Sequence, residues 1–208
     1  MILEICQLKV KPSTSTTDPS LLPALSKART QLRERVHDTN SRFYQCIEDP
    51  TLIYILGVWP SLARHTEFLQ SPEKAEILDS QNNLFDFGWV LHVEIGEKGM
   101  DELPLDAPVM AITRLFLKDG PGHVEACEEI ERKYRGVVAE GEKTWSVVDG
   151  WRIDCEEGKN EGVMVTGWEG MDAHKAFTDR TRKENPEYTL VARHYEFMEV
   201  RHVRNMES

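Results

Sequence analysis

The sequence contains one short pattern twice, and this repeat limits its folds more than any other feature. A tryptophan, a histidine and a phenylalanine recur with one spacing at an offset of 109 residues, first as Trp59, His65 and Phe68 and then as Trp168, His174 and Phe177. A β-branched and aromatic run, "LIYILGVW" or "GVMVTGW", leads into each copy and is typical of a strand. Because repeats of this kind form equivalent supersecondary units, we expect two similar halves.

The flanking segments repeat in the same order. The runs "EICQLKVKP" and "APVMAITRLFLK" predict the opening strands, and a segment with apolar residues three and four apart, typical of a helix, follows each. "RFYQCIE" and "GWRIDCE" predict second strands, and "FDFGWVLHVEI" and "HYEFMEVRHV" predict last strands. Each half therefore reads strand, helix, strand, strand, helix, strand, which is the ferredoxin-like order.

These patterns predict an α+β chain of two tandem ferredoxin-like (βαββαβ) repeats. We place the N-terminal half at 1–95, a polar linker with glycine and proline at 96–108, and the C-terminal half at 109–208. A four-stranded sheet with helices on one face leaves its other face bare. We therefore expect the two sheets to cover each other in one pseudo-dimeric α/β barrel, and the sequence leaves open a further homodimer.

Composition excludes some partners. A net charge of −11 argues against nucleic acid and anionic membranes, because phosphate-rich surfaces attract lysine and arginine. No apolar run approaches the roughly 20 residues of a membrane span, and the first ten residues lack the pattern of a leader. The four cysteines are scattered without metal-type spacing. We expect a reduced, cytoplasmic protein.

The segment "GVWPSLARHTEFLQSPE" (57–73) resembles the dimeric α/β-barrel superfamily. It is most similar to the antibiotic biosynthesis monooxygenase branch, in which a strand ends in tryptophan and the next helix carries alanine and histidine. The second half has this signature at Ala173 and His174. The resemblance implies a cofactor-free oxygenase, cyclase or isomerase of aromatic or polyketide-like molecules in secondary metabolism. The Asn, Trp and His set of the haem-degrading branch has no clear counterpart here, so we predict no haem and no other cofactor.

The repeated histidines are the predicted catalytic residues. His65 and His174 fall on the helix sides that should face the sheet, where a neutral imidazole can take a proton from a phenol or an enolisable carbon. The alternative is that both fill the helix–sheet seam, which would explain their repetition equally well. Trp59 and Trp168 are either an aromatic wall for a flat substrate or core anchors.

Other predicted substrate contacts lie on strands: Tyr44, Tyr54, Arg114, Trp151 and His92. Arg114 interrupts an apolar strand and would bind a carboxylate or phenolate if it faced a pocket, whereas facing water it would have no specific role. We expect His92 and His202 to be exposed at the barrel rim. His92 and His202 could be two ligands of a metal ion, but no carboxylate lies at a suitable spacing from them in the sequence to be the third ligand. We therefore predict no metal.

The leading hypothesis is a cofactor-independent tailoring enzyme for a small aromatic or polyketide-like molecule. The alternative is a non-catalytic binding or scaffold protein, and a second rival is a haem- or metal-dependent enzyme of the same fold. An enzyme should have a cavity of a few hundred Å³ into which a histidine or arginine projects. A scaffold should have both helix–sheet seams filled with side chains.

Overall fold

The chain divides into two compact units in the computed structural model. Unit 1 comprises residues 1–100 and 203–208, and unit 2 comprises residues 101–202. The structure describes residues 1–97, 99–141 and 145–207, without the side chains of 134, 135 and 137–141. The predicted domain boundaries, after 95 and before 109, stay a prediction.

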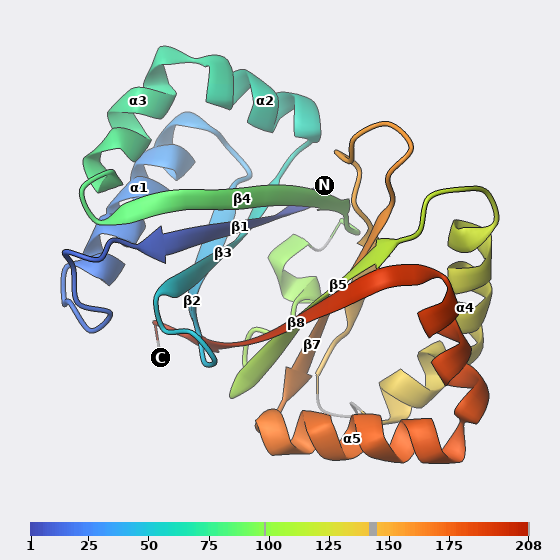
Figure 1. Cartoon of the computed structure of the whole chain (residues 1–208). Coiled ribbons are helices and arrows are strands. Elements are labelled where there is room, and N and C mark those ends of the chain that lie inside the picture. The colour runs from blue at the N-terminus through green and yellow to red at the C-terminus, as the bar shows by residue number, and fades with distance from the viewer. Residues whose placement is uncertain (98, 142–144, 208) are drawn as a thin grey trace. The chain divides into compact units, whose positions relative to one another are not determined.

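Unit 1 is an antiparallel sheet with helices on one face (Figure 1). Its strands have the order β4-β1-β3-β2. Along the chain its elements are β1 (Ile2–Val10), α1 (Leu21–Arg35), β2 (Asn40–Cys46), β3 (Leu52–Trp59), α2 (Leu62–Gln70), α3 (Pro72–Leu78), the 3-10 turn η1 (Asp79–Gln81), β4 (Phe85–Glu94) and the 3-10 turn η2 (Gly99–Glu102).

Side chains from the sheet and all three helices form one apolar cluster in unit 1. Trp59 at the end of β3 packs with Phe68 of α2 and Ile77 of α3, and Ala28 of α1 joins them. The cluster lies on the face of β1 that carries Ile2. Helix α2 can begin directly after β3 because the Ser61 hydroxyl accepts a hydrogen bond from the backbone N–H of Arg64 in the first turn of the helix.

Gly88 allows β4 to pass close to β1. A Cβ atom at this position would lie 2.9 Å from the carbonyl oxygen of Gln7, which is closer than a side chain can come. The pairing between the two strands shifts register between Gln7 and Leu8, beside this contact. Beyond the shift the strands pair regularly, and Glu4 comes to lie opposite His92.

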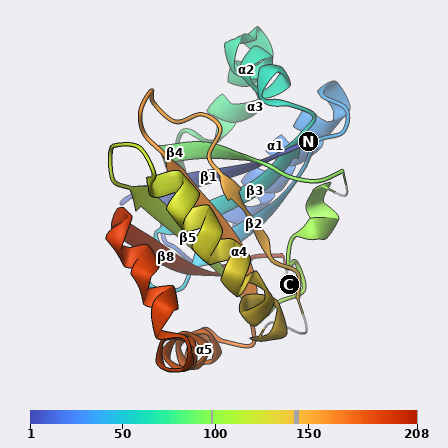
Figure 2. The ribbon, with the colours of Figure 1, turned by 90° about the vertical axis from the view of Figure 1, so that its right-hand side faces the viewer.

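Unit 2 repeats the order of elements. Its sheet has the order β8-β5-β7-β6, and Figure 2 shows α4 lying across its strands. Its elements are β5 (Val109–Leu117), α4 (His123–Gly141), β6 (Val148–Trp151), β7 (Glu161–Trp168), α5 (Met171–Glu184), the 3-10 helix η3 (Pro186–Arg193) and β8 (Tyr195–Asn205). The last residues of β8, from Val203 to Asn205, pair with β2 of unit 1.

The predicted α+β class and the βαββαβ order agree with these elements, with one local difference. We predicted the second strand of the second half at 150–156, whereas β6 spans Val148–Trp151. Arg152 explains the early end, because its guanidinium bonds to Asp154 at 2.8 Å and to Glu161 at 3.0 Å. These contacts bend the chain back toward β7. Cys127 of α4 is fully buried against Leu115 and Leu117.

No helix among the residues that the structure describes has the length and apolar character needed to cross a membrane.

Candidate functional site

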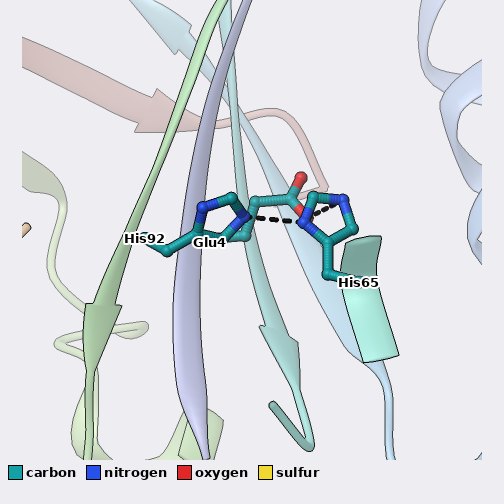
Figure 3. A group of neighbouring side chains, drawn as sticks. All are labelled: Glu4, His65 and His92. Carbon is teal, nitrogen blue, oxygen red and sulfur yellow. Dashed lines mark hydrogen bonds and ion pairs between the residues drawn. The ribbon is translucent and has the colours of Figure 1, made fainter. Parts of the chain in front are cut away.

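Three polar side chains from separate elements of unit 1 converge beneath α2 (Figure 3). His65 of α2 approaches His92 of β4, with Nδ1 of His65 2.6 Å from Nε2 of His92. Its other ring nitrogen, Nε2, lies 3.3 Å from Oε2 of Glu4 on β1. We call Glu4, His65 and His92 the unit 1 centre. Both imidazoles are buried, and the Glu4 side chain remains 13% exposed.

Trp59 holds two members of the unit 1 centre in place. Its ring lies against the imidazole of His65, with 4.4 Å between the ring centroids. Its indole Nε1 donates a hydrogen bond of 2.5 Å to Oε2 of Glu4. The position of Glu4 also follows from strand pairing, because β1 places it between Gly57 of β3 and His92 of β4.

The Glu4 carboxyl is the member of the unit 1 centre whose proton affinity its surroundings raise. Burial raises the pKa of the Glu4 carboxyl above its usual value, while the charge of His92 and the hydrogen bond from Trp59 act in the opposite direction. The Glu4 carboxyl therefore takes up a proton more readily than an exposed carboxyl does, and it does so beside the imidazole of His65.

Unit 2 contains a related group that lacks the carboxylate. Nδ1 of His174 lies 2.8 Å from Nε2 of His202, and the Trp168 ring stacks on His174 at 4.5 Å. The strand pairing places Ala111 opposite Thr166, as Glu4 lies opposite Gly57 in unit 1. The Trp168 indole accordingly donates to the Thr166 hydroxyl at 2.8 Å, where the Trp59 indole donates to Glu4.

The half-buried His174 should make the stability of the protein depend on pH. Burial, and then the charge of His202, lowers its pKa from 6.5 to about 4. The unfolded chain therefore binds this proton first, so stability is complete above about pH 6.5 and falls as the pH drops toward 4. After allowance for solvent contact we expect a loss of about 1–2 kcal/mol from this group. Urea unfolding between pH 7 and 4 measures it, and His174→Asn should remove that part of the slope; an unchanged slope would contradict the assignment.

None of the other predicted contact residues belongs to the unit 1 centre. Tyr44 and Tyr54 are fully buried, and the Tyr54 hydroxyl accepts a hydrogen bond of 2.8 Å from Gln7. Trp151 is half-buried and its indole donates to Glu128. Their assignment as substrate contacts stays a prediction.

Two placements differ from the sequence-based expectation. His92 is 3% exposed and not at a solvent-facing rim, because it lies beneath α2 against His65; its counterpart His202 is half-buried against His174. Arg114 does not face water. It is buried, with its Nε 2.5 Å from Glu161, and its guanidinium also lies 3.4 Å from Glu199.

Sequence reasoning missed Glu4. A lone acid in the apolar run "MILEICQL" was the available signal, because a buried acid needs a partner. Its presence removes the ground on which a metal site was set aside, which was the lack of a carboxylate near the two histidines.

A wide hollow of about 720 Å³ runs along α2 and is lined by Leu62, Ala63, Thr66, Glu67, Gln70 and Ser71. None of the predicted site residues lines it. The feature expected of an enzyme, a cavity into which a histidine or arginine projects, is therefore not found at this hollow.

Comparison with known proteins identifies the class of fold. No family model matches the chain, and no curated protein matches it. Several solved structures do, across nearly the whole chain, and they share a ferredoxin-like α+β fold. Their sequence identities are low, so the likeness shows the fold and nothing further.

Three of these structures illustrate the likeness. A protein of Fusobacterium nucleatum that is named as a monooxygenase has 12% identity and a TM-score of 0.63, with 99% of this chain and 92% of that chain covered. A dye-decolorizing peroxidase from Bacteroides thetaiotaomicron has 9% identity and a TM-score of 0.62, with 99% and 93% covered. A mutant chlorite dismutase from Candidatus Nitrospira defluvii has 10% identity and a TM-score of 0.59, with 97% and 90% covered.

A haem-binding protein from Thermus thermophilus also matches, with 16% identity and a TM-score of 0.54, and 98% of this chain and 90% of that chain are covered. We therefore asked whether the unit 1 centre fits haem. An axial histidine must direct a ring nitrogen at the iron beside a cavity for the macrocycle. The hollow along α2 is lined by no histidine, and neither His65 nor His92 borders it. The unit 1 centre therefore does not fit haem.

Proposed function

We propose that the chain is an enzyme that removes a proton from a small aromatic or polyketide-like molecule and so prepares it for oxygenation, cyclisation or isomerisation. The unit 1 centre is the observation that carries this proposal, because it brings a carboxylate and two imidazoles together through one hydrogen bond and one ion contact. The oxidoreductase names borne by proteins of similar fold agree with the oxygenation branch. No organic cofactor is required.

The proton would enter the centre at Glu4. This side chain is its solvent-accessible member, whereas His65 and His92 are buried behind it. A phenol or enol that meets Glu4 would give up its proton to the carboxylate, and the two imidazoles would hold the positive charge. His174, the second predicted base, has no adjoining acid and a low pKa, so the proposal places the reaction in unit 1.

Anthrone is a suitable probe because its enol is a phenol and its anion reacts with oxygen directly. The base removes one proton from the methylene carbon, and oxygen adds to that carbon as a hydroperoxide. Loss of water then leaves a second carbonyl, so one anthrone and one oxygen give one anthraquinone and one water. The substrate supplies all the electrons, and the protein supplies the proton acceptor and the position.

We further propose that the two units are copies of one ancestral half that close into a single pseudo-dimeric barrel. The shared βαββαβ order and the repeated Trp–His–His arrangement support this proposal. In a protein of this origin only one copy needs to keep the reacting group. The acid at Glu4, replaced by Ala111 at the matching place, favours unit 1.

A non-catalytic scaffold is the second candidate function. The packing of both tryptophans against both helix histidines favours it, because these side chains fill the space between helix and sheet in each unit. In that case the histidines would contribute to stability and not to turnover.

Oxygen uptake with anthrone separates the two candidates. His65→Asn should lower the rate by about 10²–10⁴-fold, the usual contribution of acid–base catalysis, because it removes the imidazole that takes up the charge behind Glu4. His174→Asn is the matched control in unit 2 and should keep the rate of the unchanged protein. Circular dichroism establishes that each variant is folded, and Glu4→Gln replaces His65→Asn if the latter does not fold. No uptake by the unchanged protein, or equal losses in the two units, would support the scaffold.

A further inference from the structure

The unit 1 centre has the composition of a metal site as well as that of a proton acceptor. Each of Glu4, His65 and His92 offers a ligand atom, and these atoms lie within 4.8 Å of one another. They come from β1, α2 and β4, so three separate elements of the fold converge on one point (Figure 3). Acidic side chains on an exposed loop often lie near one another without binding a metal. Two buried imidazoles and a mostly buried carboxylate rarely meet unless they share a ligand or a proton.

Two imidazoles and one carboxylate are a ligand set for divalent transition metals. Zinc in His₂Glu sites and non-haem iron(II) in two-histidine, one-carboxylate sites both keep open positions for water or substrate. Ligand bonds of about 2.0–2.2 Å place neighbouring donors roughly 3.3 Å apart. One ion takes a single ring nitrogen of His65, whereas the contacts with His92 and with Glu4 use different nitrogens of that ring. The ligand atoms all lie within 4.8 Å of one another, so small shifts of these side chains would bring one donor from each residue to this spacing.

The charge and surroundings of Glu4 favour a cation at this point. Among the residues that the structure describes, no lysine or arginine forms an ion pair with Glu4, so His65 is its ion-pair partner. The Trp59 indole orients the carboxylate through its 2.5 Å hydrogen bond, as outer-shell donors do for metal-bound carboxylates. The same indole contacts His65, so both ligands are positioned by one side chain.

Among the residues that the structure describes, unit 2 holds no group of three such ligands. His174 and His202 reproduce the pair of imidazoles, with 2.8 Å between their nitrogens, but Ala111 occupies the place of the acid. A chain that carries the same pair twice and the carboxylate once is therefore expected to bind one ion and not two.

We propose that Glu4, His65 and His92 bind one divalent first-row transition-metal ion, of the zinc or iron(II) type, with its open positions on the side of Glu4. The inference deepens the proposed function, on which its catalytic meaning rests, by naming an ion at the same centre. There the ion would stabilise the anion of a bound phenol or enol, as the imidazole pair would without it.

Metal titration of the chelator-treated full chain tests the site without any substrate. Zn²⁺ measured by calorimetry and Co²⁺ measured by its visible absorption should each bind one ion per chain. Glu4→Gln and His92→Asn should each weaken binding by at least about 100-fold, because loss of a ligand should cost no less than loss of an outer-shell partner. His202→Asn, the matched change in unit 2, should leave the affinity unchanged.

Several results would overturn the site: no binding, two ions per chain, or equal effects of His92→Asn and His202→Asn. If Glu4→Gln does not fold, His92→Asn carries the comparison. The two proposals fail separately, because a metal-free chain that oxidises anthrone and binds no ion keeps the proposed function and removes the metal site. A chain that binds one ion through these residues and does not oxidise anthrone keeps the metal site and removes the proposed function.

Discussion

Replacing Arg114 with leucine should lower the free energy of unfolding by about 3 kcal/mol. Arg114 is 8% exposed and its partner Glu161 is 3% exposed, with 2.5 Å between Nε and the carboxylate. The variant leaves Glu161 buried beside Arg152 alone, which lies 3.0 Å away and also pairs with Asp154. Urea unfolding followed by fluorescence measures the loss.

Two further variants show whether burial of the charge is the cause. Arg114→Leu combined with Glu161→Leu removes both charges and should restore much of the stability, since a buried ion pair and an apolar pair of similar volume are often equivalent. Arg64→Leu breaks the exposed pair with Glu67 and should cost less than about 1 kcal/mol. A double variant as unstable as the single one would show that packing, and not an unpaired carboxylate, is lost.

Trp59→Ala should destabilise unit 1 by about 3–5 kcal/mol, the usual cost of emptying a buried aromatic site. The indole is 3% exposed and contacts Phe68, with 5.5 Å between the ring centroids, besides His65. Thermal and urea unfolding measure the effect.

Trp59→Phe separates packing from the hydrogen bond. Phenylalanine keeps an aromatic ring but cannot donate to Glu4, so we expect a cost of about 1–3 kcal/mol from the unsatisfied carboxylate. The matched change Trp168→Phe removes a bond to the Thr166 hydroxyl and should cost less, because hydrogen bonds to neutral groups are weaker. If the two phenylalanine variants are equally stable, the contact with Glu4 does not stabilise the fold.

Much of the secondary structure could be predicted because it depends on local patterns. Each strand that ends in tryptophan is a run of β-branched and aromatic residues, and the helix after it carries apolar residues three and four apart. The strand predicted at 150–156 was misplaced because its end depends on Arg152, whose partner Glu161 lies nine residues further along the chain. Periodicity carries no information about such a contact.

The candidate site could be predicted only where it repeats. The offset of 109 residues identified His65 and His174, but Glu4 has no counterpart in unit 2 and so left no trace in the comparison of the halves. Its contact with His92 depends on the pairing of β1 with β4, which are separated by two strands and three helices in the chain. The predicted exposure of His92 was wrong for the same reason. His92 lies on β4, and the helix that covers it, α2, is separated from β4 in the chain by α3 and η1.

The end of β8 makes the first hundred residues an incomplete folding unit. Val203 to Asn205 pair with β2, the backbone of Met206 bonds to Phe43, and Glu207 lies 2.7 Å from Arg29. A fragment cut at residue 100 would lack this strand and would present the outer edge of β2 to other chains, where strands readily add. Gene fragments that encode one half are therefore poor substitutes for the whole, and a split version of the protein would need the segment 203–207 fused to its first piece.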